Sequence, residues 1–182
     1  MTDDTFTDRL RLSRPVPTDL DEVFAIQRDP RVWTHYPSLR HTTRDETVRM
    51  MERWERSWST AGLGSWVARL RDTEAVIGNG GCTLLGGEVW NVGYRIAADH
   101  HGSGFATELA RAGVARAREI DPDRPVIAYL VEHNTGSARV AEKLGLELVH
   151  RAPDVGNPDP AAMRLVYADR PLSPVQLQAT LQ

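Results

Sequence analysis

The sequence has a single cysteine, Cys82, in 182 residues, so no internal disulfide can form and a disulfide-held secreted fold is excluded. It also lacks any stretch approaching the roughly 20 apolar residues that a membrane span requires. The acidic start, residues 1–8, has neither the basic segment nor the apolar run of an export signal. We therefore expect a cytoplasmic protein with no membrane partner.

A strong charge of one sign is absent as well. The 22 Lys and Arg residues against 25 Asp and Glu give a formal net charge of -3, which offers no general attraction to nucleic acid. The six histidines share no ligand spacing with cysteine or acidic residues, so we expect no metal. The composition, 41% hydrophobic and 26% charged, fits one domain over residues 1–182. We place the core of this domain at about residues 8–170 and a C-terminal tail at 171–182, and we expect residues 178–182 to be frayed. The sequence is compatible with a homodimer.

Hydrophobic periodicity predicts alternating strands and helices. Two capping boxes, Thr18 with Asp21 and Thr43 with Glu46, predict two early helices. Strands are predicted at 9–14, 65–70, 75–85, 89–97, 125–131, 147–151 and 163–168, and later helices at 105–120 and 134–144. In the helix at 105–120 we expect Glu108 to face water. The fold class is α/β (α+β), a mixed, mostly antiparallel central sheet flanked by helices, in which the apolar run 125–131 has a parallel neighbour.

A glycine-rich turn, His101-Gly102-Ser103-Gly104-Phe105-Ala106-Thr107, lies between a predicted strand and a predicted helix. It carries little side-chain chemistry, but glycines let the main chain approach a ligand closely. Free N–H groups at the start of the helix, together with its dipole, favour phosphate. This pattern predicts a ligand that carries a phosphoanhydride.

Two segments resemble the GNAT superfamily of N-acetyltransferases. The family's acyl-CoA signature, Gln/Arg-x-x-Gly-x-Gly/Ala, matches at Gly104 and Ala106 and departs at His101. The stretches 92–96 and 104–108 are similar to the branch that includes ribosomal-protein N-terminal acetyltransferases. A second pattern of that branch, Asn-x-x-Ser-x-Arg-x-x-x-Lys-x-Gly, is reproduced by Asn134, Ser137, Arg139, Lys143 and Gly145. The resemblance spans about residues 8–170.

The resemblance implies acetyl-CoA as cosubstrate, held between splayed strands that carry Ile96 and Leu130. The implied binding residues are Ile96, Ala97, Ala98, His101, Gly102, Ser103, Gly104, Phe105, Ala106, Thr107, Asn134, Ser137 and Arg139. Asn134 serves there as a helix cap, a cofactor contact or both.

The resemblance also places Ser137 close to the thioester sulfur, as a proton donor to the departing thiolate. Another part of the superfamily uses a tyrosine seven residues after the asparagine, and that position is Ala141 here. Where the branch often has a glutamate base, this chain has Asn91, which cannot accept a proton at neutral pH. Glu88, three positions before Asn91, has a carboxylate that could accept a proton in its place.

For the acceptor, the family position of Trp33 and Tyr36 after the first helix and of Trp90 near the reaction centre marks them as candidate contacts. An α-amine with a pKa of about 7.7 to 8.0 needs only about 1 kcal/mol to become neutral at pH 7, whereas a lysine amine needs more than about 4. The missing base therefore favours a low-pKa amine. We predict an N-acetyltransferase that moves acetyl directly to a primary amine, either a protein N-terminal α-amine or a small molecule.

Two alternatives stay open. A non-catalytic acyl-CoA-binding or sensor module is suggested by Asn91 and Ala141, which replace groups that family members use in the reaction. A dinucleotide-binding turn is weaker, because Thr107 leaves Gly-x-Gly-x-x-Gly incomplete and the preceding strands form hairpins.

Overall fold

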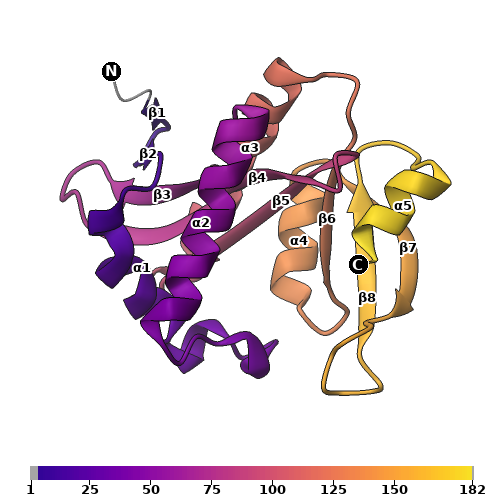
Figure 1. The fold of residues 1–182 in the computed structure, drawn as a ribbon, viewed down its shortest axis with the longest axis horizontal. Helices are drawn as coiled ribbons and strands as arrows, with labels where there is room; N and C mark the ends of the chain where they lie inside the picture. Colours follow the sequence, from indigo (N-terminus) through magenta and orange to yellow (C-terminus); the bar gives the residue numbers. More distant parts are fainter. Residues whose placement is uncertain (1–3, 182) are drawn as a thin grey trace.

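The strands of the chain form an eight-stranded sheet in the order β1-β2-β3-β4-β5-β6-β8-β7 (Figure 1). The computed structural model describes residues 4–181. Neighbouring strands are antiparallel except β5 and β6, which run parallel. The strands are β1 Thr5–Phe6, β2 Leu10–Ser13, β3 Ser65–Leu70, β4 Val76–Leu85, β5 Val89–Ile96, β6 Val126–Val131, β7 Glu147–Pro153 and β8 Met163–Ala168. This confirms the mixed, mostly antiparallel sheet, including the parallel neighbour of the apolar run at 125–131.

Helices cover both faces of the sheet. Successive side chains of β3 pack against different helices on the two faces. Trp66 and Ala68 point into the main core with α3, whereas Val67 packs with Val23 and Trp54 of α1 and α2 on the opposite face. The helices are α1 Leu20–Gln27, α2 Arg44–Ala61, α3 Phe105–Ile120, α4 Thr135–Lys143 and α5 Pro174–Thr180. In Figure 1, β6 to β8 form the right-hand part of the molecule with α4 and α5. No helix within the described residues has the length and apolar character needed to span a bilayer.

The start of the chain differs from the sequence predictions in two places. The predicted capping box of Thr18 and Asp21 is wrong: a 3-10 turn, Pro17–Asp19, precedes α1, and the Asp19 carboxylate accepts the Val16 N–H at 2.9 Å. The two-residue strand β1 was not predicted. The second capping box is confirmed, because the Thr43 N–H donates to Glu46 at 2.8 Å.

Two side-chain and terminal predictions are also corrected. Glu108 does not face water freely, because its side chain is only 16% exposed and accepts hydrogen bonds from Thr7 and Arg9. Residues 178–180 of the segment expected to fray belong to α5, where Thr180 is buried and its carbonyl accepts a hydrogen bond from Arg164 at 2.8 Å. Packing against the sheet orders this end; Gln182 lies outside the described residues.

The central parallel pair, β5 and β6, is joined only at its beginning. Register partners exist at Trp90 with Val126 and at Asn91 with Ile127, and the two strands have no further pairs. Beyond these positions β5 and β6 separate toward the glycine turn. Main-chain groups on the facing edges therefore lack sheet partners, which makes this gap a place for a ligand that can hydrogen-bond.

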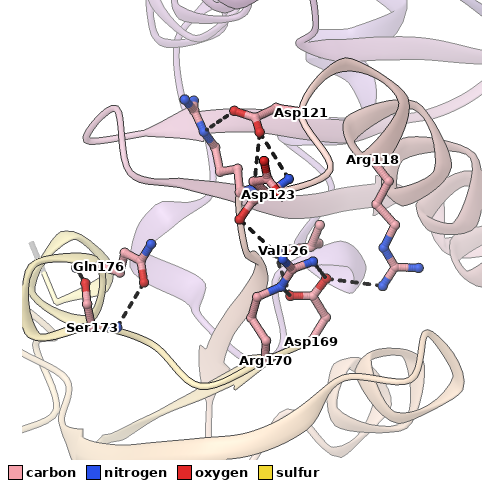
Figure 2. Close-up of polar contacts among 9 residues, drawn as sticks. Arg118, Asp121, Asp123, Val126, Asp169, Arg170, Ser173 and Gln176 are labelled. Atoms are coloured by element: carbon pink, nitrogen blue, oxygen red, sulfur yellow. Dashed lines mark hydrogen bonds and ion pairs between the residues drawn. The ribbon is translucent and has the colours of Figure 1, made fainter.

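A polar network fixes the closed end of this gap (Figure 2). The nearly buried Asp169 carboxylate accepts the Val126 N–H at 3.0 Å and pairs with Arg118 and Arg170. Arg170 also donates to the Asp123 carbonyl at 3.2 Å. The start of β6 is thereby tied to the end of β8 and to α3, so that β5 and β6 diverge from a fixed point.

Candidate active site

Two cavities meet at the end of β5, where the gap between β5 and β6 opens toward the start of α4. The larger, about 410 Å³, extends to the glycine turn and α3, and the smaller, about 270 Å³, lies beneath residues 33–39. Both are lined by His35, Tyr94, Arg95, Asn134 and Ser137. These five residues mark the junction at which two bound molecules would come into contact.

The glycine turn lines the larger cavity with main-chain atoms. Gly102 and Gly104 have φ angles of +77° and +84°, a left-handed conformation that L side chains rarely adopt. A Cβ on Gly102 would meet no atom within 4 Å, so the space beside this turn is open. Gly104 is the N-cap of α3 and offers no capping side chain, and the first N–H groups of α3 lack intrahelical acceptors. The turn therefore presents unpaired donors to the cavity, the arrangement that binds phosphate.

Arg9 supports this turn from the side. Its Nη1 donates to the Ser103 carbonyl at 2.9 Å, and its guanidinium lies 4.1 Å from the centre of the Phe105 ring. Ser103 itself does not line the larger cavity, whereas Gly102, Gly104, Phe105, Ala106 and Thr107 do. Apart from Ser103, the predicted residues of the glycine turn thus form one wall of the larger cavity. The Ser103 carbonyl is directed toward Arg9 instead.

The open edge of β5 forms another wall. The Ala97 N–H bonds back to Ile77 of β4 at 2.8 Å, so the main chain of the preceding residue, Ile96, faces the gap. The His101 ring donates through Nε2 to the Ile96 carbonyl at 2.8 Å. Ile96 and His101 line the larger cavity, while Ala97 and Ala98 pack against the hydrophobic cluster around Trp33. His101, which departs from the family signature, therefore fixes the end of the open edge.

The start of α4 completes the junction. The Asn134 Oδ1 accepts the Ser137 N–H at 3.1 Å, which makes Asn134 the cap of α4, and its amide group lies at both cavities. Burial raises the pKa of Tyr94, and the adjacent Ser137 hydroxyl offsets part of that effect. Tyr94 therefore stays protonated at neutral pH, and two hydroxyl groups lie together at the junction. Arg139 lines the larger cavity.

The remaining predicted residues fall in different places. Asn91, Trp33 and Tyr36 line the smaller cavity. Trp90 does not, because it is 1% exposed and packs in the main core. Glu88 lies in the turn between β4 and β5 and lines neither cavity.

Sequence reasoning assigned no role to Tyr94, Arg95 or His35, which the structure places at the junction. The Arg95 guanidinium lies 3.8 Å from the centre of the Trp33 ring, and its Nη1 is 3.2 Å from His35 Nε2. Burial and the Arg95 charge lower the pKa of His35 to about 4, so its ring is neutral at pH 7. Tyr94 shares the strand face of Ile96, two residues away, and this alternation was the signal available in the sequence.

Other reactive groups do not gather here. Within residues 4–181, no three His, Cys, Asp or Glu side chains are placed to hold a metal ion. Cys82 is buried, which raises the pKa of its thiol and leaves it unreactive. The site thus consists mainly of hydroxyl, amide, imidazole, guanidinium and main-chain groups, with Asp154 in the smaller cavity and Lys143 in the larger one.

The fold agrees with comparisons to known proteins. The family model described as Acetyltransferase (GNAT) domain matches residues 9–147, and the chain belongs to this family. It is 30% identical over 147 residues to "Uncharacterized protein YkkB" of Bacillus subtilis (strain 168), covering 77% of this chain and 83% of that protein.

Two solved structures share the fold. An acetyltransferase from Agrobacterium tumefaciens str. C58 superposes with a TM-score of 0.74 at 24% identity, covering 94% of this chain and 96% of that one. RimL, a ribosomal L7/L12 alpha-N-protein acetyltransferase in complex with coenzyme A, superposes with a TM-score of 0.75 at 14% identity. The match covers 90% of this chain and 95% of the RimL chain. The sequence-based identification of the GNAT family is therefore confirmed.

Proposed function

We propose that this protein transfers acetyl from acetyl-CoA directly to a primary amine. One observation carries the proposal: a cavity in the β5–β6 gap and a cavity at the end of β5 meet at Ser137 and Tyr94, and the second of them ends at the uncapped start of α3. The larger cavity would hold the cosubstrate and the smaller one the amine. Membership of the GNAT family and the coenzyme A in the RimL complex support this assignment.

The residues of the larger cavity fit such a cosubstrate. The N–H groups of Phe105, Ala106 and Thr107 and the open space beside Gly102 suit a diphosphate. His101 occupies the Ile96 carbonyl, and the other main-chain groups on the open edge of β5 suit the amide groups of a pantetheine arm. Acetyl-CoA supplies the acetyl thioester; the protein binds, orients and supplies protons.

Ser137 and Tyr94 are the groups best placed to assist the departing sulfur. Both carry an O–H at the junction, and Tyr94 is kept protonated by burial. A main-chain N–H of β5 on the edge facing the gap would stabilise charge on the carbonyl oxygen of the acetyl group. None of these roles requires a covalent link between the protein and the acetyl group.

Among the residues that the structure describes, no free carboxylate lies at the junction to take a proton from the amine. Asp154 lines the smaller cavity, but its buried carboxylate is paired with Arg164 at 2.7 Å. An amine that is partly neutral at pH 7 needs less help than a lysine side chain. We therefore propose an acceptor with a low-pKa amine, such as an α-amine.

The test is an acetylation assay with acetyl-CoA and a panel of amines, following free thiol and the mass gain of about 42 Da expected for one acetyl group. Ser137→Ala and Tyr94→Phe should each lower kcat about 100-fold, the low end of typical acid catalysis, without changing the Kd for CoA. Ser59→Ala on the exposed face of α2 and Tyr167→Phe in the core are matched controls. Tight CoA binding with no thiol release for any amine would instead favour the non-catalytic binding module.

A further inference from the structure

Arg95 is a cation inside the site that has no acidic partner among residues 4–181. No ion pair formed within the described part of the chain includes Arg95. Its neighbours are the Trp33 ring, 3.8 Å from the guanidinium carbon, and His35 Nε2, 3.2 Å from Nη1. Neither neighbour carries a negative charge, because an indole is neutral and a histidine ring is either neutral or positive.

The other arginines with little exposure are arranged differently. The Arg164 and Arg69 side chains are each 12% exposed, and each pairs with a nearly buried aspartate, Asp154 and Asp19 respectively. This fits the general cost of burying a charge without a counterion. The Arg95 charge lacks such a counterion. Burial lowers the pKa of Arg95 to about 10, so its side chain is still charged at pH 7.

The guanidinium is held in place and still has donors to offer. The Trp33 indole beneath it is itself fixed by a hydrogen bond from Nε1 to the Gln27 carbonyl at 2.6 Å. The His133 ring donates to the His35 carbonyl at 2.8 Å, which ties the segment around His35 to the loop before α4. A guanidinium has five N–H donors in a planar fork, and His35 takes one of them. Arg95 lines both cavities, so its other donors can meet a bound molecule.

We propose that Arg95 binds a carboxylate of the acceptor, so that the acceptor is a small amine of the amino-acid class that carries its own carboxylate. This inference rests on the proposed acetyl transfer and specifies its substrate. The fork of Arg95 matches a carboxylate with two parallel hydrogen bonds. Arg95 lines both cavities together with Tyr94 and Ser137, so the carboxylate would be held next to the junction where the amine must react.

The size of the smaller cavity favours a free small molecule over the end of a protein chain. At about 270 Å³ it lies just below the usual range of ligand pockets, about 300–1,000 Å³. Tyr36 and Leu39 cover it from the segment between α1 and α2. The first residue of a peptide, moreover, has no free α-carboxylate to offer Arg95.

The test compares amino acids with their amides, which keep the side chain and lose the negative charge. In solution the amide has the lower amine pKa, so without recognition of the carboxylate it should be the better nucleophile at pH 7. In the bound amino acid the Arg95 charge neutralises the carboxylate, which lowers the amine pKa toward the range that the proposed function requires. We expect the wild type to prefer the amino acid. Arg95→Gln should raise KM for the amino acid about 10- to 100-fold, the usual effect of losing charge-assisted hydrogen bonds, while KM for the amide and the Kd for CoA stay within about 3-fold.

Arg124→Gln is the matched control, because Arg124 also lies over a tryptophan, Trp90, at 5.6 Å but lines neither cavity. Arg95→Lys keeps the charge without the fork and should recover part of the affinity, while circular dichroism and melting temperature show that each variant folds. Acetylation with equal KM for acid and amide, or a peptide N-terminus preferred over the free amino acid, overturns this inference and leaves acetyl transfer standing. If no amine is acetylated, the proposed function fails; titration with N-acetyl amino acids then tests Arg95 alone, and equal Kd values for wild type and Arg95→Gln overturn its role.

Discussion

Gly102 offers a direct test of whether the glycine turn holds a diphosphate. The perturbation is a pair of variants, Gly102→Asn and Gly102→Asp, which have the same shape and differ by one negative charge. Both residues tolerate the left-handed conformation better than other side chains do, and a Cβ at this position would meet no atom within 4 Å. Gly62, which caps α2 at φ +70° with equally open space and lines neither cavity, carries the same pair as a control.

The expected magnitude follows from the open geometry. Loss of glycine costs about 1 kcal/mol at either site, which lowers the melting temperature by about 2–4 °C in both pairs. Two unit charges 4 Å apart repel by about 1 kcal/mol in water and about 4 kcal/mol at an effective dielectric constant of 20. Because the larger cavity is open to solvent, we expect a repulsion of about 1–2 kcal/mol between the aspartate and the diphosphate. Gly102→Asp should therefore bind CoA about 5- to 30-fold more weakly than Gly102→Asn.

Calorimetric titration with CoA measures this ratio, and repeating it at high salt should shrink the ratio because screening weakens the repulsion. The two Gly62 variants should bind CoA equally well. The reasoning is refuted if Gly102→Asp and Gly102→Asn have the same Kd at low salt while both remain folded. In that case the N–H groups at the start of α3 would not be the anion site.

Two further predictions concern titratable groups. His35 should remain neutral from pH 7 down to about pH 5, because burial and the Arg95 charge lower its pKa to about 4; nitrogen NMR should show an unprotonated Nε2 facing Arg95, and a protonated ring at pH 6 would contradict the packing described. Burial alone would raise the pKa of Glu108, but hydrogen bonds from Thr7 and Arg9 outweigh burial and lower it. A lowered carboxyl pKa stabilises the fold above the unfolded value of about 4.5 and loses that effect as pH falls. Glu108→Gln should therefore cost about 1–2 kcal/mol of unfolding free energy at pH 7 and less at pH 3, measured by urea denaturation, and an equal cost at both pH values would argue against it.

Much of the fold followed from local patterns. The limits of α3 and β3 match the predicted ranges, because apolar periodicity and the flanking glycines and polar turn are local properties of the chain. The first helix was less predictable: Asp19 accepts the Val16 N–H and replaces the expected pairing of Thr18 with Asp21. The C-terminal segment also looked free, and its order depends on contacts with β8 that no local pattern reveals.

The sequence determined the glycine turn, the cap at Asn134 and the family, because those features depend on spacing along one stretch of chain. Only the tertiary structure decided which side chains share the β5–β6 gap. Trp33, His35 and Arg95 come from segments about 60 residues apart, and Trp90 turned inward while Tyr94 reached Ser137. Whether a charged side chain finds a counterion is a property of the packed molecule, and for that reason Arg95 could be recognised as unpaired only once the strands were placed in space.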